Sequence, residues 1–488
     1  MAGWGSVSGG HRTGVLIASI LVGLGLGALA TQAEAGPPGK WTRVTSEPQP
    51  SNTREIGLER TPDGVLHVLW TRDSGATEQV MHRSISAGAK ALSANHQLIS
   101  TPNAVNPSVD LLPRPGGSIR ALFSGIFPGS PLPGGYSTVM ATTTSSDGAS
   151  WTPINAASNN QSGSNSPVYA AAGIGGALAS NGTPMSIWGD SSPSGGGFHL
   201  GLDGTDADGD LGSACCERDP NIAVDSATGV FAFGWNFVGA GSQPNALQVV
   251  QPLVTPVLTA PGSRATWLQQ RVGLSGRIGA GGIYAAYGFG ANPFDARPAL
   301  WRFGAAKAKV VKQPRDAEHT TLAPAPSGRI WVAWEGKDRG NRLFATRTNP
   351  KASRFGAVVS VKPPKGTDAV HRLNVEGSRG YLDLLALVNR GGGDISYWHQ
   401  RLLPGLTLTA KPKKVAAGKR VAFKVSDAGQ AVKGAKVTLK LGGKQLSKKT
   451  KASGKAKMKV PAKTKPGRYA AAARKGGYAG TKRKLRVK

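Results

Sequence analysis

The feature that most constrains this chain is a repeat of roughly 50 residues. Each copy has an apolar strand, a Gly-centred turn, a second strand ending in a large apolar residue, a loop and a third strand. The clearest copies run from Thr61-Pro62-Asp63-Gly64 to Trp70 and from Pro326-Ser327-Gly328-Arg329 to Trp334. Weaker copies end at Phe123, Trp188, Trp235, Tyr287 and Leu387.

This repeat predicts an all-β protein whose main domain is a β-propeller, because its length is that of one four-stranded blade. Short alternating segments such as 230–235 recur, whereas long helical periodicities are missing. Seven copies favour seven blades, and six is the alternative because three copies match poorly. We expect residues 41–45 to complete the last blade beside residues 394–398, since closing the ring removes exposed strand edges.

The first residues predict export. Arg12 precedes an apolar stretch, residues 14–30, and Ala33-Glu34-Ala35 has the small residues of a signal-peptide cleavage site. We therefore expect residues 1–35 to be a signal peptide and the mature protein to be secreted or held at the cell surface. The alternative is an uncleaved anchor, which the short, glycine-containing stretch disfavours.

A small, basic β-domain is predicted over residues 404–488, after a propeller domain of residues 36–403. Its strand and turn pattern, including Ala452-Ser453-Gly454-Lys455, resembles bacterial immunoglobulin-like domains of secreted proteins, which implies a β-sandwich. Of a chain with formal net charge +32, this segment holds 26 Lys and Arg residues against one acid, Asp427. Two interpretations stand level: the lysines protect strand edges, or they bind an anionic surface such as a cell-wall polymer. Scarce aromatic residues disfavour nucleic acid.

One turn resembles the Asp-box (BNR repeat) of the sialidase family. Ser145, Asp147, Gly148 and Trp151 occupy its positions, with one residue fewer than usual between Asp and Trp. The resemblance implies a structural hairpin at the blade edge, in which the carboxylate accepts backbone hydrogen bonds. The Arg-Ile-Pro segment that supplies a substrate-binding arginine in sialidases is absent. The resemblance therefore assigns no catalytic residue.

The two cysteines, Cys215 and Cys216, are adjacent. In an exported protein, which meets oxidising conditions, they are expected to form a vicinal disulfide. Such a bond is strained, because neighbouring Cα atoms lie about 3.8 Å apart, closer than most disulfides allow. The alternative is two thiols that pack or oxidise separately.

An acidic cluster lies around these cysteines. The spacing of Asp206, Asp208, Asp210 and Glu217 approaches that of a calcium-binding loop, although Leu211 stands where such a loop needs glycine. A solvated Asp-Gly turn is the alternative. No motif requires a cofactor, and the eight histidines lack zinc-site spacing.

These features favour a monomeric binding protein over an enzyme. The propeller is expected to recognise an extracellular ligand, such as a glycan, and the basic domain to hold it near an anionic surface. A sialidase-like exo-glycosidase and a structural cell-surface scaffold are the alternatives. Glu335 and Asp338, after the strand that ends at Trp334, are either a general acid and base at the propeller mouth or solvated loop acids.

Overall fold

The protein is described by a computed structural model for residues 39–45, 56–73, 77–102, 108–125, 139–154, 173–189, 198–202, 205–206, 217–237, 245–251, 256–265, 271–291, 295–312, 316–336 and 341–488. The regular secondary structure of these residues is almost entirely β-strand, with single-turn 3₁₀ helices at Pro115–Gly117 and Ser263–Ala265. Within these ranges no helix has the length and apolar character needed to cross a membrane.

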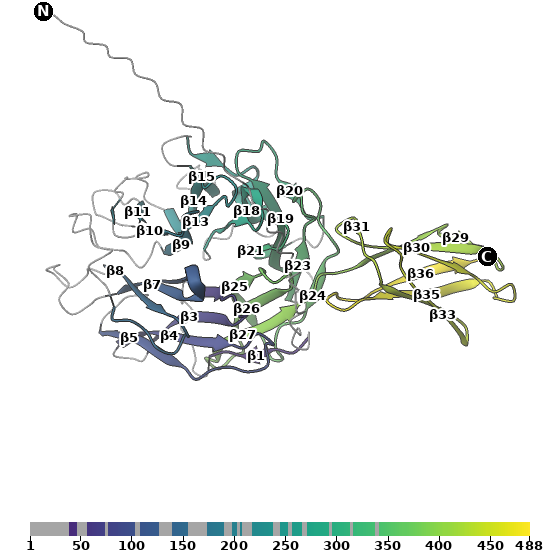
Figure 1. Ribbon diagram of the computed structural model, residues 1–488, viewed down its shortest axis with the longest axis horizontal. Helices are drawn as coiled ribbons and strands as arrows, with labels where there is room; N and C mark the ends of the chain where they lie inside the picture. Colours follow the sequence, from purple (N-terminus) through teal and green to yellow (C-terminus); the bar gives the residue numbers. More distant parts are fainter. Residues whose placement is uncertain are drawn as a thin grey trace, which may run out of the picture. The chain divides into compact units, whose positions relative to one another are not determined.

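Seven antiparallel sheets follow one another along the first four hundred residues (Figure 1). The first three are β2 (Gly57–Arg60), β3 (Leu66–Asp73), β4 (Thr77–Ile85) and β5 (His96–Pro102); β6 (Val109–Pro113), β7 (Ile119–Gly125) and β8 (Val139–Ser145); and β9 (Ile174–Leu178), β10 (Pro184–Gly189), β11 (Phe198–Leu202) and β12 (Thr205–Asp206). The fourth and fifth are β13 (Glu217–Val224), β14 (Phe231–Phe237), β15 (Ala246–Val250) and β16 (Leu258–Thr259); and β17 (Gly273–Arg277), β18 (Ala280–Phe289), β19 (Arg297–Arg302) and β20 (Lys309–Val310). The last two are β21 (Ala317–Ala325), β22 (Arg329–Gly336), β23 (Arg342–Arg347) and β24 (Val359–Val361); and β25 (Ala369–Glu376), β26 (Leu382–Asn389), β27 (Ile395–Leu402) and β1 (Thr42–Arg43).

The sheets are the seven blades of a β-propeller. The first strand of each sheet contacts the first strand of the next, and β25 of the last sheet contacts β2 of the first. The seven repeat markers, from Trp70 to Leu387, all lie on the second strand of their sheet. The prediction of seven blades is therefore confirmed, and the six-blade alternative is wrong.

The N-terminal segment closes the ring as the sequence predicted. Strand β1 pairs antiparallel with β27, with Thr42 opposite His399 and Arg43 opposite Trp398. The Val44 amide continues the ladder by donating to the Tyr397 carbonyl at 2.8 Å. The last blade is thus built from both ends of the propeller sequence, and β1 covers the outer edge of β27.

Close contact between blades requires glycine on the inner strand β17. A Cβ atom added to Gly276 on β17 would lie 1.9 Å from the carbonyl oxygen of Val224, which ends the inner strand of the preceding blade. Only a residue without a side chain allows these two inner strands to approach so closely.

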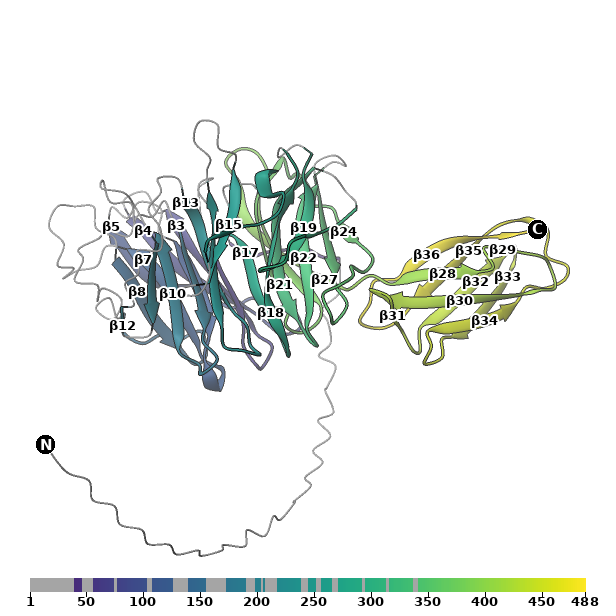
Figure 2. The same cartoon turned by 90° about the horizontal axis from the view of Figure 1, so that it is seen from above.

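Residues after β27 form a two-sheet β-sandwich, seen at the green-to-yellow end of the colour bar in Figure 2. One sheet contains β28 (Thr407–Lys411), β30 (Arg420–Asp427), β31 (Gln430–Ala431) and β34 (Lys455–Lys459). The other contains β29 (Lys414–Val415), β36 (Thr481–Val487), β35 (Gly467–Arg474), β32 (Lys436–Leu441) and β33 (Lys444–Lys449). Residues of β34 alternate exposed and buried, as the Lys-apolar pattern predicts, and the apolar ones join a single core with Val421 and Phe423.

Candidate functional site: the central channel

A cavity of about 400 Å³ lies in the channel at the centre of the ring. All seven inner strands contribute to its wall, which places it on the axis of the propeller. The volume falls within the range of small-molecule pockets, about 300–1,000 Å³. Its polar side chains are Glu59, Asp110, Asn221, Arg271, Ser275, Arg277, Glu376 and Ser378.

Arg271 spans the channel at the starting ends of the inner strands. Its guanidinium donates to Asp110 Oδ1 at 2.8 Å and to three backbone carbonyls of other blades, those of Ile56, Val109 and Ile174. Asp110 is held in turn by the Gly176 amide, 2.9 Å from its Oδ2. Because one side chain of blade five thereby joins blades one, two and three, it forms a fixed floor to the cavity.

Glu59 is an acid of the channel wall whose pKa is strongly raised. Burial, reinforced by the negative charge of Glu376, raises the pKa of Glu59 to about 8. The side chain is half-buried on the channel wall at the finishing end of β2. At neutral pH it is therefore a neutral carboxylic acid, which can donate a hydrogen bond to a ligand as well as accept one.

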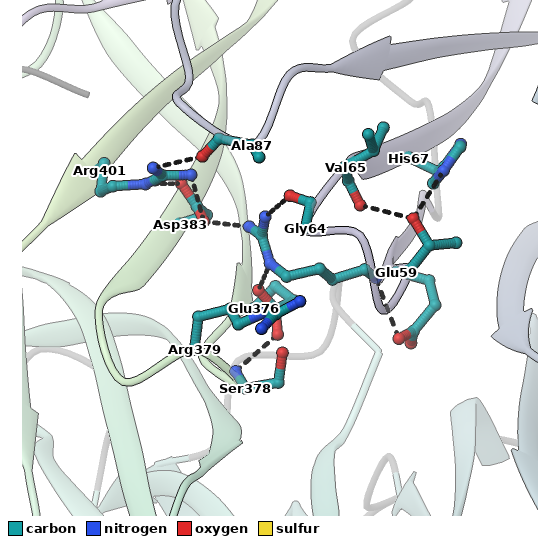
Figure 3. A network of polar contacts seen from close by, with 12 residues as sticks. Glu59, Gly64, Val65, His67, Ala87, Glu376, Ser378, Arg379, Asp383 and Arg401 are labelled. Atoms are coloured by element: carbon teal, nitrogen blue, oxygen red, sulfur yellow. Dashed lines mark hydrogen bonds and ion pairs between the residues drawn. The ribbon is translucent and has the colours of Figure 1, made fainter. Parts of the chain in front are cut away.

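Buried ion pairs beside Glu59 join the first and last blades (Figure 3). Arg60 contacts Glu376 at 2.5 Å and also pairs with Asp383. Asp383 accepts from Arg401 Nε at 2.9 Å and lies 2.7 Å from His399 Nε2. Burial alone acts to raise the pKa of Asp383, but the hydrogen bond and charge of His399 and the two arginines lower it to about 2.

The predicted Asp-box turn follows β8. The Asp147 carboxylate accepts hydrogen bonds from the Ala149 and Ser150 amides, both at 2.8 Å, and these bonds lower its pKa to about 2. Ser145 Oγ accepts from the Gly148 amide at 2.7 Å. This turn packs on blade one rather than facing the channel: a Cβ on Gly148, where φ is +74°, would lie 2.7 Å from the ring of His67. The ring of Trp151 packs edge-on against that of His82, with 5.1 Å between the ring centroids.

Several predicted site residues lie outside the described residues. These are Cys215, Cys216, Asp208 and Asp210. Asp206 lies in β12 and Glu217 begins β13, but their side chains are not described. The disulfide and the calcium loop therefore stay predictions.

Of the predicted acid pair, Asp338 also lies outside the described residues. Glu335 is fully buried near the end of β22, so it is not a solvated loop acid. It lies beside Glu318 and His319 instead.

Sequence reasoning missed Glu59, Arg271 and Glu376, which belong to no local motif. Their partners belong to other blades, so the spacing of residues along the chain does not reveal these contacts. One signal was present: Glu59 and Glu376 both stand at or next to the last residue of an inner strand, just before a Gly-containing turn. Equivalent positions in successive blades meet around one channel mouth.

Comparison with known proteins finds likeness among solved structures. No family model matches the chain, and no curated protein matches it in sequence. The polysaccharide lyase Uly1 is 12% identical, with a TM-score of 0.41 over 78% of this chain and 94% of its own. The α-L-arabinofuranosidase Arb93A from Fusarium graminearum is 13% identical, with a TM-score of 0.39 over 64% of this chain and 98% of its own. An ulvan lyase is 8% identical, with a TM-score of 0.40 over 76% of this chain and 95% of its own.

Proposed function

We propose that this is a secreted binding protein that takes an uncharged, hydroxyl-rich ligand, the end of an extracellular glycan, into the central channel. The observation that carries the proposal is the cavity of about 400 Å³ whose wall is built by all seven inner strands. Such a pocket is shaped by a rigid ring and is pre-formed, which reduces the entropic cost of binding.

The cavity wall favours a neutral polar ligand over a cation or a carboxylate. Glu59 carries a proton at neutral pH, since its pKa is about 8, and offers both a donor and an acceptor. Ser275 and Asn221 already donate to carbonyls of the protein, so they offer a ligand the acceptor capacity of a hydroxyl and of an amide oxygen. Hydroxyl groups, which donate and accept, match such a wall.

Both arginines of the wall are already hydrogen-bonded to other groups of the protein. Arg271 bonds Asp110 and three carbonyls. Arg277 donates to the Gly328 and Gly281 carbonyls at 2.8 and 2.9 Å and also to that of Pro350. Among the cavity residues that the structure describes, no guanidinium is left to clamp a ligand carboxylate, which weighs against sialic acid as the ligand and against the sialidase alternative.

The β-sandwich supplies attachment to an anionic polymer in this proposal. Residues of like charge stand directly opposite each other on β30 and β34: Arg420 faces Lys459, and Lys424 faces Lys455. All four are exposed, while Asp427 is buried. Directly opposed like charges destabilise a sheet, and a bound polyanion removes that repulsion. This supports surface binding over edge protection as the role of these lysines.

The glycan proposal is tested by screening the mature chain on an array of neutral and anionic glycans. We expect binding to neutral glycan ends, weakened in the variants Glu59→Gln and Ser275→Ala. Asn349→Ala is the matched control, because Asn349 makes only turn contacts with Ser353 and Arg354. Binding restricted to sialosides, or unchanged in both channel variants, contradicts the proposal.

Attachment is tested separately, by sedimenting the full mature chain with purified cell wall at low and high salt. We expect Lys455→Gln/Lys457→Gln/Lys459→Gln to weaken sedimentation at low salt and high salt to abolish the difference, because salt screens exposed charges. Equal sedimentation of the variant and the wild type contradicts this role. A fluorogenic glycoside panel that shows turnover lost in Glu59→Gln would instead make the channel an active site.

A further inference from the structure

A second polar cluster lies in blade six. Glu318 and His319 lie near the start of β21, and Glu335 stands directly opposite Glu318 on β22. All three are buried, with exposed fractions of 2%, 4% and 0%. Each offers one potential ligand atom, and these atoms all lie within 4.8 Å of one another.

A β-bulge brings the cluster together. Successive residues of a regular strand point to opposite faces, so Glu318 and His319 would ordinarily diverge. Here the pairing of β21 with β22 shifts register between Glu318 and Thr321, and His319 adopts a φ of +47°. The extra residue turns the imidazole to the side of the two carboxylates.

The Nε2 atom of His319 lies close to two oxygen atoms. It is 3.2 Å from the Val370 carbonyl oxygen of blade seven, to which it donates only in the Nε2–H tautomer, and 3.7 Å from Glu335 Oε2. To bind a metal ion, Nε2 gives up the bond to Val370 and the ring carries its proton on Nδ1. The distance between Nε2 and Glu335 Oε2 is too long for a hydrogen bond. It is close to the separation of about 3.4 Å between two ligands of one tetrahedral ion with bonds of about 2.1 Å.

A small cavity adjoins the cluster. It has a volume of about 20 Å³ and is lined by His319, Thr320, Arg271 and Asn236, among others. A cavity needs about 10–15 Å³ to hold a water molecule, so this one has room for one water. Three protein ligands and one water complete a four-coordinate site.

We propose that Glu318, His319 and Glu335 bind a divalent transition-metal ion of the Zn²⁺ type, with a water from the adjoining cavity as fourth ligand. One imidazole and two carboxylates suit Zn²⁺ better than Ca²⁺, which prefers six or more oxygen ligands. These three residues do not line the channel cavity, and they are not the residues of the predicted calcium loop.

The test uses the full mature chain after treatment with EDTA and removal of the chelator. We expect it to bind one equivalent of Zn²⁺ by calorimetry, to gain thermal stability with Zn²⁺ and to gain none with Ca²⁺. Co²⁺ should give the intense visible absorption of a tetrahedral site. That spectrum is recorded on the wild type, so the test does not depend on the folding of a variant.

Variants then assign the ligands. His319→Gln and Glu335→Gln should each weaken Zn²⁺ binding at least tenfold and remove the visible Co²⁺ absorption. His96→Gln, a half-buried histidine of blade one, is the matched control and should leave both unchanged. No Zn²⁺ binding by the wild type, the weak absorption of an octahedral Co²⁺ site, or equal binding by wild type and His319→Gln overturns the proposal.

Discussion

Replacing Arg60 by alanine should strongly destabilise the propeller, because it removes the positive charge between the first and last blades. The Arg60 side chain is 1% exposed, Asp383 is fully buried, and Glu376 is 9% exposed. Breaking a buried ion pair by removing one partner costs about 3–5 kcal/mol, since the remaining charge stays buried. We expect Arg60→Ala to lower the free energy of unfolding by that amount.

Arg43 is a matched control in the same part of the fold. It pairs with Asp394 at 2.9 Å, but the two side chains are 34% and 31% exposed. Exposed pairs contribute about 0–1 kcal/mol, so Arg43→Ala should cost no more than that. Urea unfolding followed by tryptophan fluorescence measures both variants. If the losses of unfolding free energy in the two variants differ by less than 1 kcal/mol, the buried network does not stabilise the closure of the ring as argued.

The remaining predictions concern acid stability and blade contact. Burial lowers the pKa of His67 to about 4 and that of His82 to about 3, below the ordinary value of 6.5. Folding then favours the neutral rings, so their contribution to stability is complete above pH 6.5. It falls below that pH, by roughly 2 kcal/mol per ring at pH 5. Thermal melts should show the melting temperature falling with pH, and falling less steeply in the double variant His67→Gln/His82→Gln. A wild-type melting temperature that does not change between pH 8 and pH 5 contradicts it. Gly276→Ala should lower the free energy of unfolding by about 1–3 kcal/mol, because the added methyl group overpacks against β13. The control Gly476→Ala, at a position with open space around it, should change that free energy by no more than about 0.5 kcal/mol. Equal melting temperatures for the two variants would contradict this.

The fold could be predicted from the sequence because each blade repeats one local pattern. Trp70 and Trp334 mark equivalent positions of β3 and β22, and the turn before each is formed by residues adjacent in the chain. Closure could also be predicted, since residues 41–45 had to cover the edge that the last blade would otherwise expose. These features depend on period and turn chemistry, which one sequence records directly.

The candidate sites could not be predicted in the same way. Arg271 reaches carbonyls of three other blades, and Glu59 owes its raised pKa to burial and to Glu376 of the last blade. His319 joins its neighbours only because a bulge alters the strand alternation. Such arrangements depend on ring closure and on local backbone irregularity, and neither leaves a spacing motif.

Binding of a neutral glycan beside Glu59 is tested most directly by the affinity of the mature chain for its best neutral glycan ligand, measured by calorimetry from pH 6 to pH 9.5. Loss of the proton from Glu59 removes a donor and adds a charge to the channel, and the pKa of that acid is about 8. We expect constant affinity below pH 7, a steep fall above pH 8, and a flat, weaker profile for Glu59→Gln. An affinity that does not change with pH in the wild type, or a variant with the wild-type profile, would show that the ligand does not bind in the channel beside Glu59.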